Sequence, residues 1–163
     1  MVVPSQAVLY AQALGGWLFA RGWTLGGAES CTGGLVSHYI TDVGGSSAYF
    51  MGTVVAYANH VKEGLLGVPG AVLAAHGAVS AEVARAMAQG ARQALGVDVA
   101  YAVTGIAGPT GGTQGKPVGT VYVAVASPLG EVVERHVWTS DRRGNKQCSA
   151  VAVLDLLARH LSV

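Results

Sequence analysis

The sequence has few charged residues and no long uninterrupted apolar run. Charged residues make up 12% of its 163 residues and hydrophobic residues 51%, a balance typical of a folded domain rather than a disordered segment. Glycine, threonine, serine or a charge interrupts each apolar run before it reaches about 18 residues, so we expect no membrane-spanning helix. The opening segment, MVVPSQAVLY, has no basic region ahead of an apolar core. We therefore expect a cytoplasmic protein with no membrane association.

The sequence also lacks the features of nucleic-acid-binding proteins, disulfide scaffolds and metal sites. Ten Lys and Arg against nine Asp and Glu give a formal net charge of +1 with no basic stripe, so we expect no nucleic-acid partner. Cys31 and Cys148 form neither a CxxC motif nor a zinc spacing, and we expect two reduced thiols. The five histidines are scattered and form no HExxH motif, so we expect no metal and no cofactor.

Glycine, by contrast, is abundant. The 24 glycines gather at 26–27, 33–34, 44–45 and between 105 and 119. Because glycine costs backbone entropy, this many in an ordered chain indicate loops that need a positive φ or a close approach to something else. We expect several tight loops around one site.

Segments with helical periodicity alternate with short apolar segments typical of strands. The expected helices are 5–20, a second that begins at Ser30 or Thr32 and ends near Thr41, 59–66, 81–95 and 144–161. The expected strands are 23–28, a buried strand at 48–57, 97–103, and a hairpin of 118–126 with 131–139. This alternation predicts one three-layer α/β domain over residues 1–163, built on a mixed sheet.

The segment 28–34, AESCTGG, lies where the first strand should pass into the second helix. Main-chain amides at the start of a helix are unpaired and favour negative charge. The hydroxyl of Ser30 could therefore attack a carbonyl carbon while nearby amides stabilise the oxyanion that forms. The alternative, which the local sequence alone favours, is that Ser30 only caps the helix.

A serine nucleophile needs a base, and no His–Asp arrangement is evident. Lys62, soon after the strand that ends at Tyr57, is the candidate, because a poorly solvated lysine loses affinity for its proton and can accept one from serine. Tyr57 could donate a hydrogen bond or stack on a ring. The alternatives are an ordinary surface lysine and a core tyrosine.

Two further segments could bind an anion. Residues 105–112 form a glycine-rich loop after Thr104, which matches neither a dinucleotide fingerprint nor a phosphate loop but offers free amides. Arg142 and Arg143 are the only adjacent arginines, and a guanidinium suits phosphate through its planar set of donors. The alternatives are a flexible surface loop and a solvated charge cluster at a helix start.

Taken together, these segments resemble the CinA C-terminal domain family. The strings that carry the resemblance occur in the family's order and span nearly the whole chain: AESCTGG (28–34), GGSSAYF (44–50), Tyr57 with Lys62, HGAVS (76–80), TGIAGPTGG (104–112) and KPVGTVY (116–122). The resemblance implies a three-layer α/β/α sandwich on a mixed, mostly parallel five-stranded sheet. It also implies the activity of the family's stand-alone form, nicotinamide-nucleotide amidohydrolase. That enzyme converts nicotinamide mononucleotide to nicotinate mononucleotide and ammonia without a metal.

The same resemblance implies roles for individual residues. Ser30 and Lys62 match the family's serine and lysine, and Tyr57 matches its tyrosine. The residues expected to contact the substrate are Cys31, Thr32 and Gly33 at the oxyanion, and Thr104, Gly105, Gly108, Gly112 and Arg142 around the remainder of the nucleotide. The arginine segment departs from the family pattern, because it reads Ser140-Asp141-Arg142 with Lys146 at the later arginine position. Whether Arg143 or Lys146 contributes to phosphate binding stays open.

Two other functions stay open beside the amidohydrolase. One is a non-catalytic nucleotide-binding or regulatory domain that kept the pocket, and the other is an amidase for a different small substrate. In each case the expected partner is a small molecule. The apolar composition is also compatible with a homo-oligomer.

Overall fold

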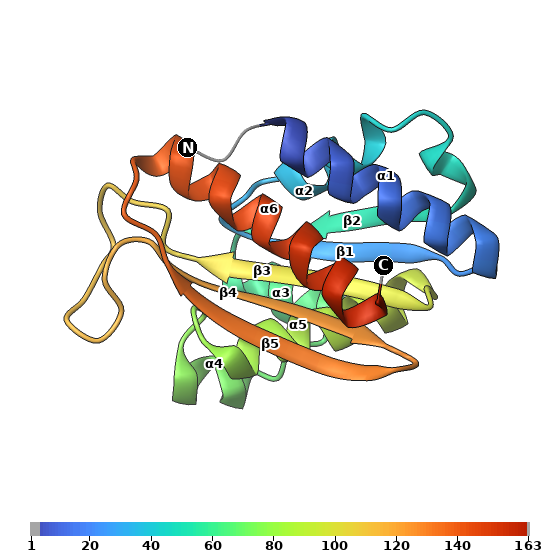
Figure 1. Ribbon diagram of the computed structural model, residues 1–163. Helices are drawn as coiled ribbons and strands as arrows, with labels where there is room; N and C mark the ends of the chain where they lie inside the picture. The colour runs from blue at the N-terminus through green and yellow to red at the C-terminus, as the bar shows by residue number, and fades with distance from the viewer. Residues whose placement is uncertain (1–3, 163) are drawn as a thin grey trace.

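A five-stranded sheet runs through the middle of the molecule, with helices on both of its faces (Figure 1). The computed structural model describes residues 4–162. The strands are β1 (Leu25–Glu29), β2 (Phe50–Val55), β3 (Val99–Gly105), β4 (Thr120–Ser127) and β5 (Gly130–Val137). The helices are α1 (Pro4–Arg21), α2 (Leu35–Thr41), α3 (Asn59–Leu66), α4 (Gly70–His76), α5 (Ala81–Leu95) and α6 (Arg142–Leu161), with a short 3₁₀ turn, η1 (Ser46–Ala48).

The strand order is β2-β1-β3-β4-β5, so β2 and β5 form the edges. β1 pairs in parallel with both β2 and β3, whereas β4 is antiparallel to β3 and to β5. All strands except β4 therefore run in the same direction. This arrangement confirms the expected mixed, mostly parallel five-stranded sheet between helical layers.

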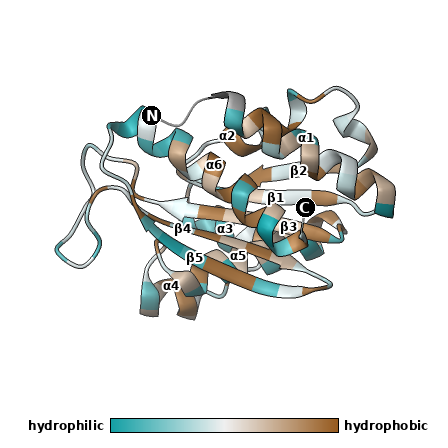
Figure 2. Cartoon of the chain, viewed as in Figure 1, coloured by the Kyte–Doolittle hydropathy of each residue, from teal (hydrophilic) through white to brown (hydrophobic). Residues whose placement is uncertain are grey.

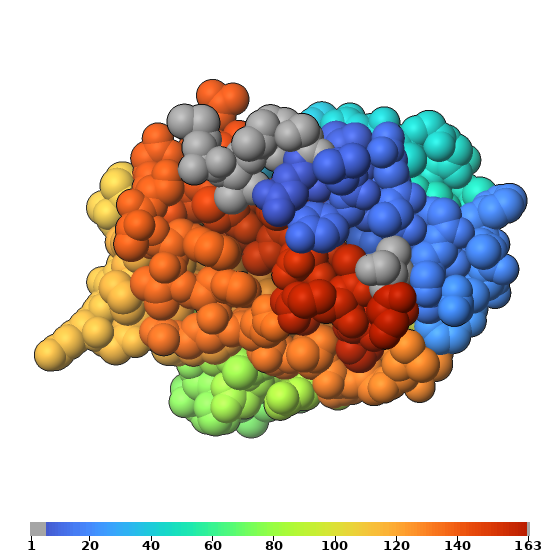
Figure 3. Space-filling view, viewed as in Figure 1, coloured from blue at the N-terminus to red at the C-terminus, as the bar shows by residue number. Residues whose placement is uncertain are grey.

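Two hydrophobic clusters fill the spaces between the sheet and its helices. One joins α1, α2 and α6 to the sheet and includes Leu14, Tyr101 and Leu154. The other joins α3, α4 and α5 to the opposite face and includes Met87 and Leu66. Apolar residues recur along the strands, whereas the segment between β3 and β4 is mostly hydrophilic (Figure 2). That segment projects from the body of the molecule (Figure 3).

Three features differ from the sequence predictions. The strand expected at 48–57 is β2, which is an edge strand and not a buried one; Met51 and Val55 are exposed on it. The second helix begins at Leu35, not at Ser30 or Thr32, because Gly33 and Gly34 adopt positive φ angles of 63° and 101° that do not continue a right-handed helix. The short helix α4 was not predicted from the sequence. None of the helices in the described part of the chain has the length and apolarity needed to cross a bilayer.

Candidate active site

Ser30 lies at the carboxyl end of β1, where parallel strands commonly present their ligand sites. Its amide donates to the carbonyl of Val103 in β3 (3.0 Å), which continues the strand pairing by one residue. Successive side chains of a strand point to opposite faces. Glu29 therefore points towards α2, and Ser30 points towards α3 on the other face.

Lys62 of α3 meets Ser30 on that second face. Its Nζ lies 3.3 Å from Ser30 Oγ, and it donates to the carbonyl oxygens of Ala56 (2.8 Å) and Tyr57 (3.3 Å). The lysine is 1% exposed, and this burial lowers its pKa from the ordinary 10.5. A serine hydroxyl and a desolvated amine, 32 positions apart in the sequence, are thus brought into contact.

A cavity of about 280 Å³ opens over this pair. Several residues singled out in the sequence line it: Ser30, Cys31, Tyr57, Lys62, Thr104, Gly105, Gly108 and Arg142. Three others lie outside the lining. Thr32 is buried, whereas Gly33 and Gly112 are exposed. A side chain at Gly112 would collide with the main chain of Val118, so this glycine serves the close packing of the loop.

Fewer of the main-chain amides beside Ser30 are free than the sequence predicted. The amide of Gly33 donates to the carbonyl of Ser30 (3.1 Å), and those of Gly34 and Val36 donate to the carboxylate of Glu29. Among the described residues, the amides of Cys31 and Thr32 have no acceptor. An oxyanion near Ser30 Oγ could therefore be bound by these two amides, whereas the amide of Gly33, also expected to contribute, is bonded to the carbonyl of Ser30.

Cys31 is an unsuitable nucleophile although it adjoins Ser30. The residue is 6% exposed and belongs to the core cluster on the α2 face. Burial raises the pKa of its thiol to about 12, so the thiol stays protonated at neutral pH.

The glycine loop is held by the start of α6. Arg142 Nη1 donates to the carbonyl of Gly108 (2.6 Å), and the buried Asn145 Nδ2 donates to that of Ala107 (3.0 Å). Within residues 4–162, the amides of Ala107, Gly108, Thr110 and Gly111, which line the cavity, have no acceptor, whereas that of Ile106 donates to the carbonyl of Thr120 (2.9 Å). The loop therefore offers free donors to an anion, next to a guanidinium.

Tyr57 and Thr104 complete the cavity walls. Tyr57 is 61% exposed and is not a core tyrosine; its hydroxyl accepts from Arg142 Nη2 (3.1 Å). Thr104 Oγ1 donates to the carbonyl of Ala78 (2.8 Å). Because that contact uses the hydroxyl proton of Thr104, a ligand can only donate to this oxygen.

A larger cavity of about 920 Å³ lies between α1, α2 and the start of α6 and does not contain Ser30 or Lys62. Arg143 and Lys146 line this second cavity and not the first, whereas Arg142 lines both. Arg143 and Lys146 therefore do not line the cavity of the serine–lysine pair, although Lys146 Nζ lies close to Gly33 in the turn that follows Ser30. Arg142 is the cation that faces that pair.

Three polar residues of the site were missed in the sequence. Glu29 directly precedes Ser30, Asn59 lies at the start of α3 in the cavity wall, and Asn145 holds the glycine loop. The position of Glu29 beside Ser30 was the one available signal. The described residues contain no group of three or more His, Cys, Asp and Glu that could hold a metal ion.

Comparison with known proteins identifies close relatives. The family model for the CinA C-terminal domain matches residues 9–161. A CinA-like protein of Geobacter sulfurreducens is 57% identical over 141 residues, which are 86% of this chain and 34% of that protein. A CinA-like protein of Salinibacter ruber is 49% identical over 162 residues, which are 99% of this chain and 39% of that protein. The chain thus spans between 34% and 39% of the length of these two curated relatives.

Solved structures share the fold over nearly the whole chain. The competence damage-inducible protein A of Klebsiella pneumoniae superposes with a TM-score of 0.92 at 31% identity, over 96% of this chain and 97% of that one. The competence/damage inducible protein CihA of Agrobacterium tumefaciens superposes with a TM-score of 0.91 at 34% identity, over 98% of each chain.

Proposed function

Because the chain belongs to the CinA C-terminal domain family, we propose that it is an amidohydrolase that cleaves the carboxamide of nicotinamide mononucleotide. The observation that carries the proposal is the 3.3 Å contact between Ser30 Oγ and the buried Nζ of Lys62. The products are nicotinate mononucleotide and ammonia.

The surroundings of Lys62 suit a general base. A neutral amine has two N–H bonds and one lone pair. The carbonyls of Ala56 and Tyr57 can accept the two N–H bonds, which leaves the lone pair directed at the Ser30 hydroxyl. Burial disfavours the charged amine and so increases the fraction of Lys62 that can accept a proton.

The first half of the reaction forms an acyl-enzyme. Ser30 Oγ attacks the carboxamide carbon as its proton passes to Lys62 Nζ, and the carbonyl oxygen becomes an oxyanion. The amides of Cys31 and Thr32 are the donors available to stabilise it. The C–N bond then breaks, and the leaving nitrogen takes the proton from Lys62 and departs as ammonia.

The second half restores the enzyme. Lys62, again neutral, accepts a proton from water as the water oxygen attacks the ester carbon. Lys62 then returns this proton to Ser30 Oγ as the intermediate collapses and the C–O bond breaks. Nicotinate mononucleotide is released, and no redox step or added co-reactant besides water is required.

Ammonia release from nicotinamide mononucleotide tests the proposal directly. The folded protein should produce ammonia and nicotinate mononucleotide in equal amounts. Binding of the nucleotide without ammonia release would favour the non-catalytic nucleotide-binding alternative. Ammonia release only from another small amide would favour an amidase with a different substrate.

Removal of the substrate phosphate should lower kcat/KM by roughly two or more orders of magnitude, because several charge-assisted hydrogen bonds act together on that group. Nicotinamide riboside lacks only this phosphate, so its kcat/KM against that of the mononucleotide is the measurement. Arg142→Ala should lower kcat/KM for the mononucleotide by roughly 10- to 100-fold and leave the riboside nearly unchanged. Arg142→Lys should recover part of the loss, since the charge remains without the planar donor set.

Arg143→Ala is the matched control, because Arg143 is adjacent in sequence but lines only the second cavity. It should leave both substrates unaffected. Equal losses for both substrates in Arg142→Ala would show that Arg142 supports the fold or the catalytic step through Gly108 and Tyr57 instead. Equal rates of the wild type on both substrates would contradict a phosphate site at the glycine loop.

Activity should survive metal chelation, because the serine–lysine pair supplies both nucleophile and base. Turnover measured before and after prolonged dialysis against EDTA should agree. Loss of turnover that is restored by one added metal ion would contradict the serine–lysine mechanism.

A further inference from the structure

Glu29 and Lys62 are the two buried charged side chains among the described residues, with 0% and 1% exposure. They lie on opposite faces of the sheet, on either side of Ser30, and form no ion pair with each other. A buried charge is costly unless hydrogen bonds compensate for it. The proposed reaction uses Lys62, so the burial of Glu29 needs a separate explanation.

The carboxylate of Glu29 accepts six hydrogen bonds. Oε2 accepts from Thr32 Oγ1 (2.7 Å) and from the amides of Gly34 (2.9 Å) and Val36 (3.2 Å). Oε1 accepts from the amide and hydroxyl of Ser37 (2.9 and 2.6 Å) and from the hydroxyl of Tyr101 (3.2 Å). The donors of Oε2 lie in or next to the turn that contains Ser30, whereas those of Oε1 lie in α2 and β3.

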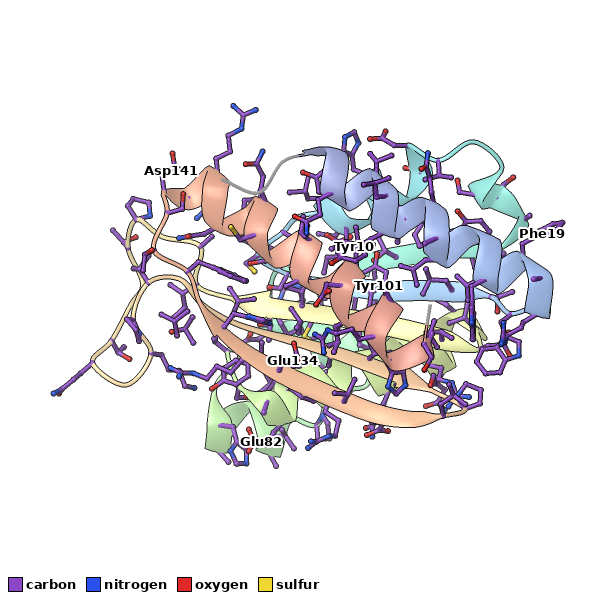
Figure 4. The ribbon with its side chains drawn as sticks, viewed as in Figure 1. Tyr10, Phe19, Glu82, Tyr101, Glu134 and Asp141 are labelled. Atoms are coloured by element: carbon purple, nitrogen blue, oxygen red, sulfur yellow. The ribbon has the colours of Figure 1, made fainter. Side chains whose placement is uncertain are left out.

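The neighbouring strand is shaped to support this carboxylate. Tyr101 lies on the α1–α2–α6 side of the sheet (Figure 4), directly opposite Gly27 of β1. A Cβ at Gly27 would fall 2.2 Å from the Tyr101 ring, so only glycine lets the ring cross β1 and direct its hydroxyl at Glu29. Burial and the Glu29 charge raise the pKa of Tyr101, which keeps that hydroxyl a donor.

The six contacts determine which amides remain free beside Ser30. In a helix that began at Ser30, the amide of Gly34 would bond to the carbonyl of Ser30 and that of Val36 to the carbonyl of Thr32. Glu29 takes both amides instead, and α2 begins only at Leu35. Residues 30–34 are thereby held as a turn in which the amides of Cys31 and Thr32 have no acceptor among the described residues.

We infer that Glu29 is a positioning residue for catalysis: through the turn at 30–34 it fixes Ser30 Oγ and the two amides that bind the oxyanion. The inference rests on the proposed role of Ser30. Glu29 touches no substrate atom and lines neither of the two cavities described above. Its effect should therefore appear in kcat and not in KM, since the nucleotide is held by the glycine loop and Arg142.

Two variants, each of which removes one hydroxyl that donates to Glu29, distinguish positioning of Ser30 from stabilisation of the fold alone. Thr32→Val removes the donor inside the catalytic turn and keeps the Thr32 amide, whereas Tyr101→Phe removes a donor outside it. Both should lower the melting temperature. Thr32→Val alone should lower kcat by about tenfold with KM nearly unchanged, because a small displacement of the reacting groups is costly.

Glu29→Gln provides the conservative variant. Its amide oxygen can occupy the Oε2 position, where two donors are main-chain amides that cannot reorient. Its NH₂ then faces the Ser37 and Tyr101 hydroxyls, which can turn to accept, and only the main-chain amide of Ser37 loses its acceptor. We expect it to retain more activity than Glu29→Leu, which has no acceptor. If Glu29→Leu fails to fold, the comparison of Thr32→Val with Tyr101→Phe still decides the question.

The rate at which a fluorophosphonate probe labels Ser30, followed by mass spectrometry, gives a second readout that needs no amide substrate. Attack on phosphorus also places an oxyanion beside the turn, so Thr32→Val should slow labelling by about tenfold and Tyr101→Phe should not. Equal effects of the two variants, or none from Thr32→Val, would overturn the inference.

The same probe distinguishes failure of the inference from failure of the proposed function. If the wild type is labelled at Ser30 but releases no ammonia, the amidase proposal is refuted, and the labelling rates of the two variants still test the role of Glu29. A wild type that is not labelled at Ser30 would refute the inference as well.

Discussion

Ser30→Ala is expected to lower kcat for nicotinamide mononucleotide hydrolysis by about 10³-fold or more, because loss of a nucleophile leaves only the contributions of binding and oxyanion stabilisation. The substitution removes one oxygen atom from a residue that is 8% exposed, and Lys62 keeps its contacts with Ala56 and Tyr57. We therefore expect KM and the melting temperature to change little. Steady-state kinetics and thermal unfolding of the same preparation test both statements.

Cys31→Ala is the matched control for this prediction. The thiol adjoins Ser30 and is the obvious rival nucleophile, but burial raises its pKa to about 12 and its side chain belongs to the core. Its loss should change kcat only mildly and should cost some stability through the small cavity that it leaves. An inactive Cys31→Ala together with an active Ser30→Ala would reverse the assignment.

Local signals in the sequence were sufficient for several elements of the fold. The predicted bounds of α3 and α5 agree with the structure, since Gly67 and Gly96 adopt the left-handed conformation that ends each helix. Ser80 caps α5, and its hydroxyl accepts from the amide of Val83 (3.2 Å). Where capping residues and periodicity coincide, the backbone has few alternatives.

The start of α2 shows the limit of such signals. Ser30 and Thr32 are favourable capping residues, and nothing in their neighbours predicts that the amides of Gly34 and Val36 bond to the side chain of Glu29. That bond depends on the burial of Glu29 under α2, which is a tertiary property. The edge position of β2 was also hidden, because an apolar strand reads the same whether one or both of its sides are paired.

The candidate site depends on contacts between distant segments. Ser30 and Lys62 meet because β1 and β2 pair in parallel, so that β2 carries the chain to α3 beside the end of β1. Arg142 reaches Tyr57 from 85 positions away. In the sequence, each of these four residues was a candidate that also had an ordinary structural explanation. Only the family resemblance placed them in one site.

Lys62→Met should lower kcat by about 10³-fold or more, comparable to the loss of the serine, because an unactivated hydroxyl is a weak nucleophile and the leaving nitrogen loses its proton donor. Methionine fills most of the lysine's volume without an amine. Lys62→Arg is the matched control for charge: it keeps a cation and donors at this position but cannot release a proton in the accessible pH range. Both variants should therefore be nearly inactive, although only one of them loses the charge.

The pH dependence of the wild type distinguishes a base from a merely structural lysine. Burial lowers the pKa of Lys62 below its ordinary 10.5, so kcat/KM should rise with pH as the free enzyme loses this proton and should level off above the lowered pKa. The residual activity of Lys62→Met should lack this limb. A residual activity that keeps the wild-type limb would assign it to another group and contradict the role of Lys62.

The lowered pKa of Lys62 also makes the stability of the protein depend on pH. Between the lowered pKa of folded Lys62 and its ordinary 10.5, the unfolded chain binds more protons than the folded one, so the Lys62 contribution to the free energy of unfolding increases with pH across that window. Buried tyrosines with raised pKa values, such as Tyr101, change stability in the opposite direction at high pH. These tyrosines are present in both wild type and Lys62→Met, so their contribution cancels in the difference between the two free energies of unfolding.

Chemical denaturation at several pH values should therefore show wild type gaining stability relative to Lys62→Met as pH rises. A difference that stays constant with pH would show that Lys62 has the same pKa in both states and is not the desolvated base that the mechanism requires.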